Sequence, residues 1–398
     1  MKIALKEYRS TIISDSVCVH LNMYKVKENT PILFSFDYPP MSGGISRLCE
    51  AIANEFTVNG GVVLTKYPQK KSYLHKKLQH YYVPEKRPWR ELISILWLLK
   101  IANKSRLIIA DNWHPEGSLS ILFGGRRNVI LSHGAELFPG EGWFRQSVWK
   151  KWMRFTLQKA NVVIANSKYT ASLVKNAAPN ANITVIPLGV DHHRFFPFTN
   201  KDEVKNKFGV QGKFVIGSIS RLHKFKGYQT VFRAIKSLPE EVRKKVFYII
   251  AGDGSDKNWL EEECKILGID DIVQFIGFVS ETDLPSFYNA LDLFVLCTEE
   301  QPEERKVEGF GLVFLEAQSC GVPVIGTRTG GIPSAVKENN GGFLINPNQS
   351  HELQKRIIKL VTTPRFLIEM GKKARRRVLQ EATWEHYIKK LYKTIESI

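Results

Sequence analysis

The sequence predicts an α/β protein made of two successive units, each a parallel β-sheet covered by helices. Short apolar runs typical of buried strands alternate with segments of helical periodicity along most of the chain. A stretch bounded by prolines at residues 187–197 divides this alternation into two series. The length of 398 residues fits two domains of ordinary size. We therefore expect domains at residues 30–195 and 196–381, preceded by an extension at residues 1–29.

The first unit opens with an apolar strand at residues 32–36, followed by a cluster of turn-forming residues that ends in Gly43 and Gly44. A helix should follow at residues 45–56, where apolar residues recur every three or four positions. Strand, glycine-rich turn and helix form the opening unit of a doubly wound sheet. Later strands are expected at residues 62–65, 80–83, 107–111, 129–132, 162–166 and 183–187, and helices at 89–102 and 142–158.

The second unit repeats this alternation. Its helices include one that starts at Leu312 and runs to Ser319, and an amphipathic one at residues 384–398. Neither unit carries the Gly-x-Gly-x-x-Gly fingerprint in its strand-to-helix turn, which argues against a dehydrogenase. Its strands are expected at residues 214–220, 247–251, 273–276, 293–297, 322–326 and 342–345.

Composition indicates an intracellular protein with an anionic partner. The five cysteines are scattered, odd in number and without metal-ligand spacing, which argues for a reducing compartment and against a zinc site. We find neither a secretory leader nor an apolar stretch long enough to span a membrane, so we expect a cytoplasmic protein. The net charge is +18, and residues 1–195 hold 27 Lys and Arg against 13 Asp and Glu. This asymmetry suggests a membrane surface, an acidic acceptor or nucleic acid as partner, unless it is simply a solvated basic face.

Basic and aromatic residues interleave in the segment 66–106. Such interleaving suits a membrane interface or a nucleic-acid groove. The alternative is that residues 92–101 form a buried helix of the first domain, with the charges on its flanking loops.

Two glutamates bracket the start of the predicted helix at Leu312. Glu308 lies just before that start, the turn between them contains Gly309 and Gly311, and Glu316 lies about two helical turns deeper. A helix start offers unpaired backbone N–H groups and a positive dipole end to phosphate or sugar oxygens. On spacing alone, the two carboxylates could equally be a helix-terminal residue and a solvated one.

Arg221 and Lys226 follow the first strand of the second unit, and Gly227 lets backbone approach closely there. Two fixed cations at the carboxyl end of a strand suit a diphosphate, because arginine grips phosphate oxygens bidentately and lysine adds a point charge. In isolation, the segment could also be a basic surface turn before a helix.

Single residues at other strand ends are weaker candidates. His133 ends a strand of the first unit, although a lone histidine is more often structural than catalytic. Glu136 could cap the following segment, and Asp253 lies in a Gly-Asp-Gly turn that we interpret as structural.

The segment from Glu308 to Glu316, and its continuation through residues 317–331, resembles the two-glutamate signature of GT4-family retaining glycosyltransferases of the GT-B fold. The Ser-Arg…Lys-Gly segment at 220–227 and the His-Gly-Ala-Glu segment at 133–136 resemble further motifs of that family. The resemblance spans about residues 31–345. It implies two Rossmann-like domains facing a central cleft, with a terminal helix at residues 382–398 that crosses back to the first domain.

The resemblance also implies roles for single residues. Glu316 would hold the ribose hydroxyls of a nucleotide-sugar, Glu308 a hydroxyl of the donor sugar, and His133 would lie beside that sugar. Arg221 and Lys226 would take the charge of the leaving diphosphate, so no metal or other cofactor is expected. The remaining donor-binding positions, which act mostly through backbone, are Gly43, Gly44, Phe278, Gly309, Phe310, Gly311 and Leu312.

We therefore expect a metal-independent retaining transferase that moves a hexose from a nucleotide-sugar to a lipid-linked or polysaccharide-precursor acceptor. The resemblance favours GDP-mannose as donor, and a UDP-sugar is possible. No nucleic acid is expected as partner, whereas an anionic membrane surface, the inner face of the cytoplasmic membrane, could attract the basic first domain. Two alternatives remain, a GT-B epimerase of UDP-sugars and a non-enzymatic basic protein that binds membranes or nucleic acid.

Overall fold

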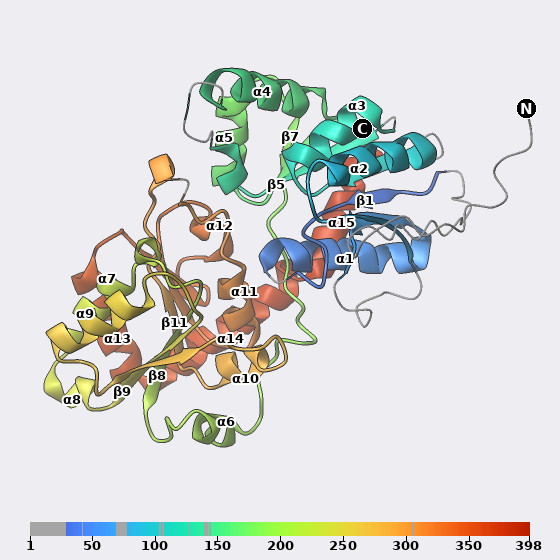
Figure 1. The fold of residues 1–398 in the computed structure, drawn as a ribbon. Coiled ribbons are helices and arrows are strands. Elements are labelled where there is room, and N and C mark those ends of the chain that lie inside the picture. Colours follow the sequence, from blue (N-terminus) through green and yellow to red (C-terminus); the bar gives the residue numbers. More distant parts are fainter. Residues whose placement is uncertain are drawn as a thin grey trace, which may run out of the picture.

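The computed structural model describes residues 29–398 except 42, 69–77, 103–104, 106, 126, 139–141, 143–144 and 305 (Figure 1). Most of the predicted extension, residues 1–28, lies outside the described part. The chain forms two α/β units, each built on one parallel sheet, as the sequence predicts.

The first sheet has the strand order β3-β2-β1-β4-β5-β6-β7, and all of its pairs are parallel. The seven predicted strands are confirmed, with ends shifted by one or two residues. Apolar residues fill these strands because helices cover both faces of the sheet. The strands are β1 Ile32–Phe34, β2 Val62–Lys66, β3 Gln79–Val83, β4 Leu107–Ala110, β5 Arg127–Ser132, β6 Val162–Ala165 and β7 Ile183–Val185.

Successive strand residues point to opposite faces, so β1 contributes to two cores. Leu33 packs with α1 (Gly44–Asn59) on one face, whereas Ile32 and Phe34 pack with α2 (Trp89–Ile101) on the other. Three more helices cover the face of α2: α3 Ser118–Phe123, α4 Lys150–Lys159 and α5 Lys168–Ala177. The predicted helix at 142–158 is instead a π-type turn at Arg145–Trp149 that continues into α4, and a similar turn at Trp113–Gly117 precedes α3.

The second sheet has the order β10-β9-β8-β11-β12-β13, again entirely parallel. Its six predicted strands are confirmed: β8 Phe214–Ile219, β9 Val246–Ala251, β10 Val273–Gly277, β11 Leu293–Leu296, β12 Val324–Thr327 and β13 Gly342–Ile345. The predicted helix at Leu312–Ser319 is confirmed as α11. The other helices of this unit are α6 Lys201–Lys207, α7 Tyr228–Lys236, α8 Glu240–Arg243, α9 Lys257–Leu267, α10 Leu284–Asn289, α12 Ile332–Ala335, α13 Ser350–Thr362 and α14 Pro364–Glu381.

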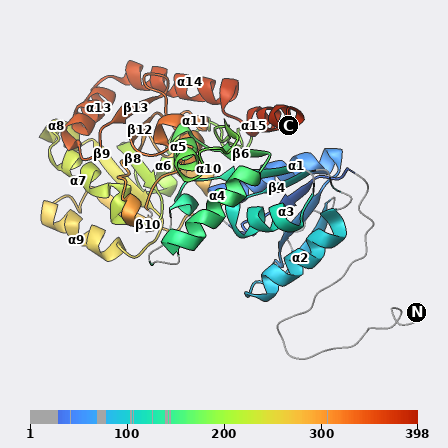
Figure 2. The same cartoon turned by 90° about the horizontal axis from the view of Figure 1, so that it is seen from above.

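The last helix, α15 (Trp384–Glu396), leaves the second unit and packs beside α1 of the first (Figures 1 and 2). The link between the units runs alongside the start of α15, where the amide of Val190 donates to the carbonyl of Ala382 at 3.0 Å. The two chain crossings therefore lie side by side. No helix in the described part of the chain is long and apolar enough to cross a membrane.

Candidate active site

A cavity of about 350 Å³ lies between the two units and is lined by residues from both. The first unit contributes the loop after β1, the start of α1 and the end of β5, and the second contributes the end of β8 and the start of α11. Because the carboxyl ends of parallel strands lie at one edge of a sheet, each unit presents its strand-end loops to this cavity. The lining residues are Asp37, Gly43, Gly44, Ile45, Ser46, His133, Asn166, Leu188, Arg221, Glu308, Gly309, Phe310, Gly311 and Leu312.

His133 is fixed in one orientation at the end of β5. Its Nε2 lies 2.7 Å from the carbonyl oxygen of Asp111. Because a carbonyl oxygen only accepts, Nε2 carries a proton, and Nδ1 is the nitrogen left for a ligand. Glu136 folds back and accepts from the Ser132 hydroxyl and the His133 amide, both at 2.7 Å. Glu136 therefore holds the loop that carries His133.

Asp111, which stands behind His133, is buried together with Glu116. Burial raises the pKa of Asp111 to about 7, although the Ser35 hydroxyl donates to its Oδ2 at 2.5 Å. Burial, together with the charge of Asp111, also raises the pKa of Glu116 well above its usual range. The contact with His133 is made by the backbone carbonyl of Asp111, whereas its carboxyl group pairs with Ser35 in the core of the first unit.

The loop before α11 lies against the first unit at Gly309. A Cβ atom on Gly309 would fall on the carbonyl oxygen of His133, and it would also lie 3.4 Å from Nδ2 of Asn166. That amide nitrogen of Asn166 donates to the same carbonyl at 3.3 Å. Only a glycine fits at position 309 while the two units stay this close.

The cations of the second unit lie beside Glu308. Nζ of Lys226 lies 2.9 Å from Oε2 of Glu308, and both side chains are largely shielded from solvent. Arg221 lines the cavity next to this pair. Gly227 ends the Lys226 turn with a φ of 75°, and a Cβ there would fall on the Cys297 carbonyl. Glycine at this position lets the lysine turn pack tightly on Cys297, the residue that follows β11.

Glu316 lies on the buried face of α11, where its side chain is 1% exposed. The Tyr288 hydroxyl donates to its Oε2 at 2.7 Å, and the guanidinium of Arg47 from α1 pairs with its Oε1. Arg47 also donates to both carboxylate oxygens of Glu281, at 2.9 and 3.1 Å. One arginine of the first unit therefore joins two carboxylates of the second.

A second cavity of about 220 Å³ adjoins this ion-pair network and shares Leu312 with the first. Arg47, Arg194 and Glu316 are among its lining residues. A ligand that extends from the first cavity past Leu312 reaches Glu316.

The structure brings together nine of the twelve predicted site residues in the first cavity: Gly43, Gly44, His133, Arg221, Glu308, Gly309, Phe310, Gly311 and Leu312. Of the other three, Lys226 joins through its pair with Glu308, and Glu316 lies in the adjoining cavity. Phe278 follows β10, is 77% exposed and lines neither cavity. The backbone carbonyl of Asp253 accepts a hydrogen bond from the amide of Leu222, so Asp253 stabilises the turn in which it lies.

Sequence reasoning missed Arg47 and Asn166. Arg47 lies three residues after Gly44, on the first turn of α1, and so directly follows the glycine-rich turn. Nothing in the local sequence indicates that its partners are Glu316 and Glu281. Asn166 follows β6 in the same way that His133 follows β5. Polar residues directly after strands of a parallel sheet are a usable signal for such positions.

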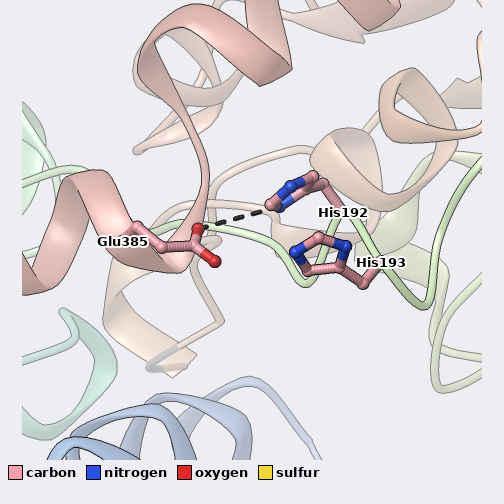
Figure 3. Close-up of side chains that lie close together, drawn as sticks. All are labelled: His192, His193 and Glu385. Atoms are coloured by element: carbon pink, nitrogen blue, oxygen red, sulfur yellow. Dashed lines mark ion pairs between the residues drawn. The ribbon is translucent and has the colours of Figure 1, made fainter.

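Among the described residues, one group has the spacing of metal ligands: His192, His193 and Glu385 (Figure 3). The Nδ1 of His192 lies 3.7 Å from Oε2 of Glu385, and burial lowers the pKa of this histidine. The group lies where the link meets α15, and its three residues line neither cavity.

Two family models match the two units separately. Residues 42–194 match glycosyltransferase family 4, and residues 200–377 match the glycosyl transferases of group 1. Solved structures of similar fold include HepE of Anabaena in complex with UDP-glucose, with a TM-score of 0.75 and 22% identity over 93% of this chain and all of that chain. The lipopolysaccharide glycosyltransferase WaaG has a TM-score of 0.68 at 18% identity over 90% of this chain and 98% of that chain. These likenesses confirm the predicted GT-B fold.

Curated relatives share more of the sequence. A GDP-mannose-dependent α-(1-6)-phosphatidylinositol monomannoside mannosyltransferase of Mycolicibacterium smegmatis is 28% identical over 89% of this chain and 94% of its own length. An N-acetyl-α-D-glucosaminyl L-malate synthase of Bacillus anthracis is 30% identical over 61% of each chain. The relatives differ in their acceptors.

Proposed function

Because the chain belongs to the GT4-type glycosyltransferases of the GT-B fold, we propose that it transfers a hexose, with retention of configuration, from a nucleotide-sugar to a lipid-linked or polysaccharide-precursor acceptor. The observation that carries this proposal is the cavity lined by His133 from one unit and by Arg221 and Glu308 from the other. Such a cavity can hold a charged leaving group on one side and an acceptor on the other.

The donor diphosphate would bind at the end of β8. Arg221 and Lys226 provide two cations there, and the N-terminal turn of α11 adds backbone N–H groups and its dipole. These groups would balance the charge that a divalent cation balances in other transferases, so the proposed reaction needs no metal. Fixed donors of this kind stabilise charge on a departing diphosphate most strongly when they are held in place beforehand.

Glu308 would position the donor sugar, because one of its oxygens pairs with Lys226 and the other is available to a sugar hydroxyl. Glu316 would accept from the ribose hydroxyls, as the family resemblance implies. Its carboxylate is already paired with Arg47 and Tyr288, so ribose must share or replace one of these partners. Donor binding and the contact between the two units are therefore linked through Glu316.

In the proposed step, the bond between the anomeric carbon and the diphosphate oxygen breaks while the acceptor hydroxyl attacks from the same face. The acceptor proton passes to the departing phosphate oxygen, which balances the reaction without a protein base. His133 lies where it can hold the acceptor or the sugar through Nδ1. Positioning and electrostatic stabilisation then provide the catalysis.

GDP-mannose is the favoured donor because the mannosyltransferase relative aligns over 89% of this chain. A UDP-sugar is the second choice, since UDP-glucose is bound in a structure of the same fold. The phosphatidylinositol mannoside acceptor of that relative favours a lipid-linked acceptor here, with the enzyme peripheral on the inner face of the cytoplasmic membrane.

Calorimetric titration of the full chain with GDP, UDP and ADP, their monophosphates and their sugar conjugates would test the donor site. One base should bind best, and its diphosphate should bind more tightly than its monophosphate. Arg221→Ala and Lys226→Ala should each weaken the diphosphate roughly 10- to 100-fold, because each removes a charge-assisted contact. The matched control is Lys224→Ala, in the same turn, whose ammonium lies 4.2 Å from the Trp259 ring centre.

Equal losses in Lys224→Ala and Lys226→Ala would contradict the assigned diphosphate site. Conversion of the sugar conjugate into an epimer without any acceptor would instead establish the epimerase. Once an acceptor is found, the anomeric configuration of the product, read by NMR, tests retention.

A further inference from the structure

Helix α2 carries apolar side chains on its solvent side as well as on its core side. Trp97, Leu98 and Ile101 are buried against the first sheet. The opposite side exposes Trp89 by 58%, Leu92 by 48%, Leu96 by 65% and Leu99 by 54%. The alternative that residues 92–101 form a buried helix of the first domain is therefore confirmed for the core side of α2 and wrong for its solvent side.

The four exposed residues, here called the outer stripe, follow one another at intervals of three, four and three positions. This spacing places them along one side of an α-helix about 15 Å in length. Figure 2 shows α2 at the outer edge of the first unit, beside α3. A continuous apolar row on a protein surface usually marks an interaction site, whereas single exposed leucines do not.

Cations flank the outer stripe at both ends. Lys86 and Arg87 are exposed just before the helix, and Lys100 is exposed in its last turn. The acidic residue on α2, Glu91, is paired with Arg87 and Arg90, both at 2.8 Å. The surrounding sequence, residues 66–106, holds eleven Lys and Arg against two Asp and Glu. An apolar row bordered by lysine and arginine suits an interfacial helix on anionic lipids.

The length of α2 and the charge around it decide which partner covers the outer stripe. At 13 residues, α2 is too short to span a bilayer, so it can only lie along one. Pairing of the outer stripe with that of a second copy would bring two strongly basic segments together, which opposes such a dimer. An anionic bilayer would bury the outer stripe among its lipid chains and attract the flanking cations to its headgroups. Trp89 at the start of the row belongs to the residue type that prefers the lipid–water interface.

We propose that α2 docks the protein on an anionic bilayer, with the outer stripe below the headgroups and Lys86, Arg87 and Lys100 at the lipid phosphates. This proposal deepens the proposed function, because it would hold the unit that carries His133 at the surface where a lipid-linked acceptor resides. The docking surface itself shares no residue with the donor site.

Flotation of the full chain with vesicles of phosphatidylcholine alone, or with 30% phosphatidylglycerol, tests this proposal. Wild type should float with the anionic vesicles, and less of it should float at high salt. Leu92→Gln and Leu96→Gln should each weaken binding roughly tenfold, since each removes a buried leucine from the interface. The matched control is Ile266→Gln on α9, where the isoleucine is 71% exposed and lies in the second unit.

Equal flotation of wild type and the Leu92→Gln/Leu96→Gln double variant would overturn the proposal. So would light scattering that shows a wild-type dimer and a monomeric double variant, because the outer stripe would then be a contact between copies. Nucleoside diphosphate titration of the same variants separates the two proposals. Donor binding should be unchanged in them whether or not the membrane docking holds.

Discussion

Replacing Arg47 with alanine should destabilise the protein by leaving a buried carboxylate without its cation. Arg47 joins Glu316 to Glu281 across the two units, and the Glu316 side chain is 1% exposed. Removal of one partner from a buried ion pair commonly costs about 3–5 kcal/mol, because the remaining charge is still desolvated. We expect about 3 kcal/mol, since the Tyr288 hydroxyl still donates to Glu316.

This loss of stability can be measured as a shift of the thermal melting midpoint. Unfolding entropy near 2.1 cal/mol/K per residue gives about 0.8 kcal/mol/K for this chain, so the midpoint should fall by about 4 °C. The control is Arg194→Ala, whose partner Glu281 is 47% exposed. Surface pairs of this kind contribute about 0–1 kcal/mol, so the control should move the midpoint by no more than about 1 °C.

Differential scanning fluorimetry of four proteins tests the reasoning: wild type, Arg47→Ala, Glu316→Gln and the double variant. The double variant should melt above Arg47→Ala, because glutamine removes the unpaired charge while keeping the shape. If Glu316→Gln lowers the midpoint further in the Arg47→Ala background, the buried-pair argument is refuted. Equal shifts for Arg47→Ala and Arg194→Ala would refute it as well.

Three further predictions concern the core and the cleft. Because burial raises the folded-state pKa of Asp111 to about 7, the folded state binds a proton that the unfolded state loses near pH 4, so stability should fall as pH rises from about 4 to 7. Asp111→Asn should make the melting midpoint less dependent on pH across that window. Gly309→Ala should weaken donor binding at least tenfold in calorimetry, because the added methyl group meets the His133 carbonyl; unchanged affinity would show that the close contact is dispensable. Donor binding should be the same with and without EDTA, and a loss of heat on chelation would mean that the two cations do not suffice.

Most of the fold was predictable because each buried strand is a short, nearly continuous apolar run. The errors lie at strand ends, where polar residues such as Asp111 and Asn166 follow the last ladder pair and turn toward the cleft or the core. The two π-type turns, Trp113–Gly117 and Arg145–Trp149, were not predicted. Pro115 and Gly117 interrupt helical periodicity in the first of them, so the pattern gave no signal for a helix.

The candidate site was predictable where one motif carries several residues, as from Glu308 to Glu316. The network around Arg47 was not, because its partner Glu281 lies 234 positions away and such a pair leaves no local pattern. The exposure of Leu92, Leu96 and Leu99 was also hidden. Helical periodicity marks an apolar side only by contrast with a polar one, and α2 is apolar on both sides.

The crossing of α15 determines when the first unit can be completed during synthesis. Tyr387, Leu391 and Ile395 belong to the same core as Leu48 and Ile52 of α1, yet they follow the whole second unit in the chain and are made after it. Until then, the nascent first unit exposes the apolar face of α1 while the second unit is being made. The first unit, although translated first, therefore cannot bury its whole core before the second unit has been made. Any division of the gene between the two units would leave that face uncovered unless the α15 segment is supplied in trans.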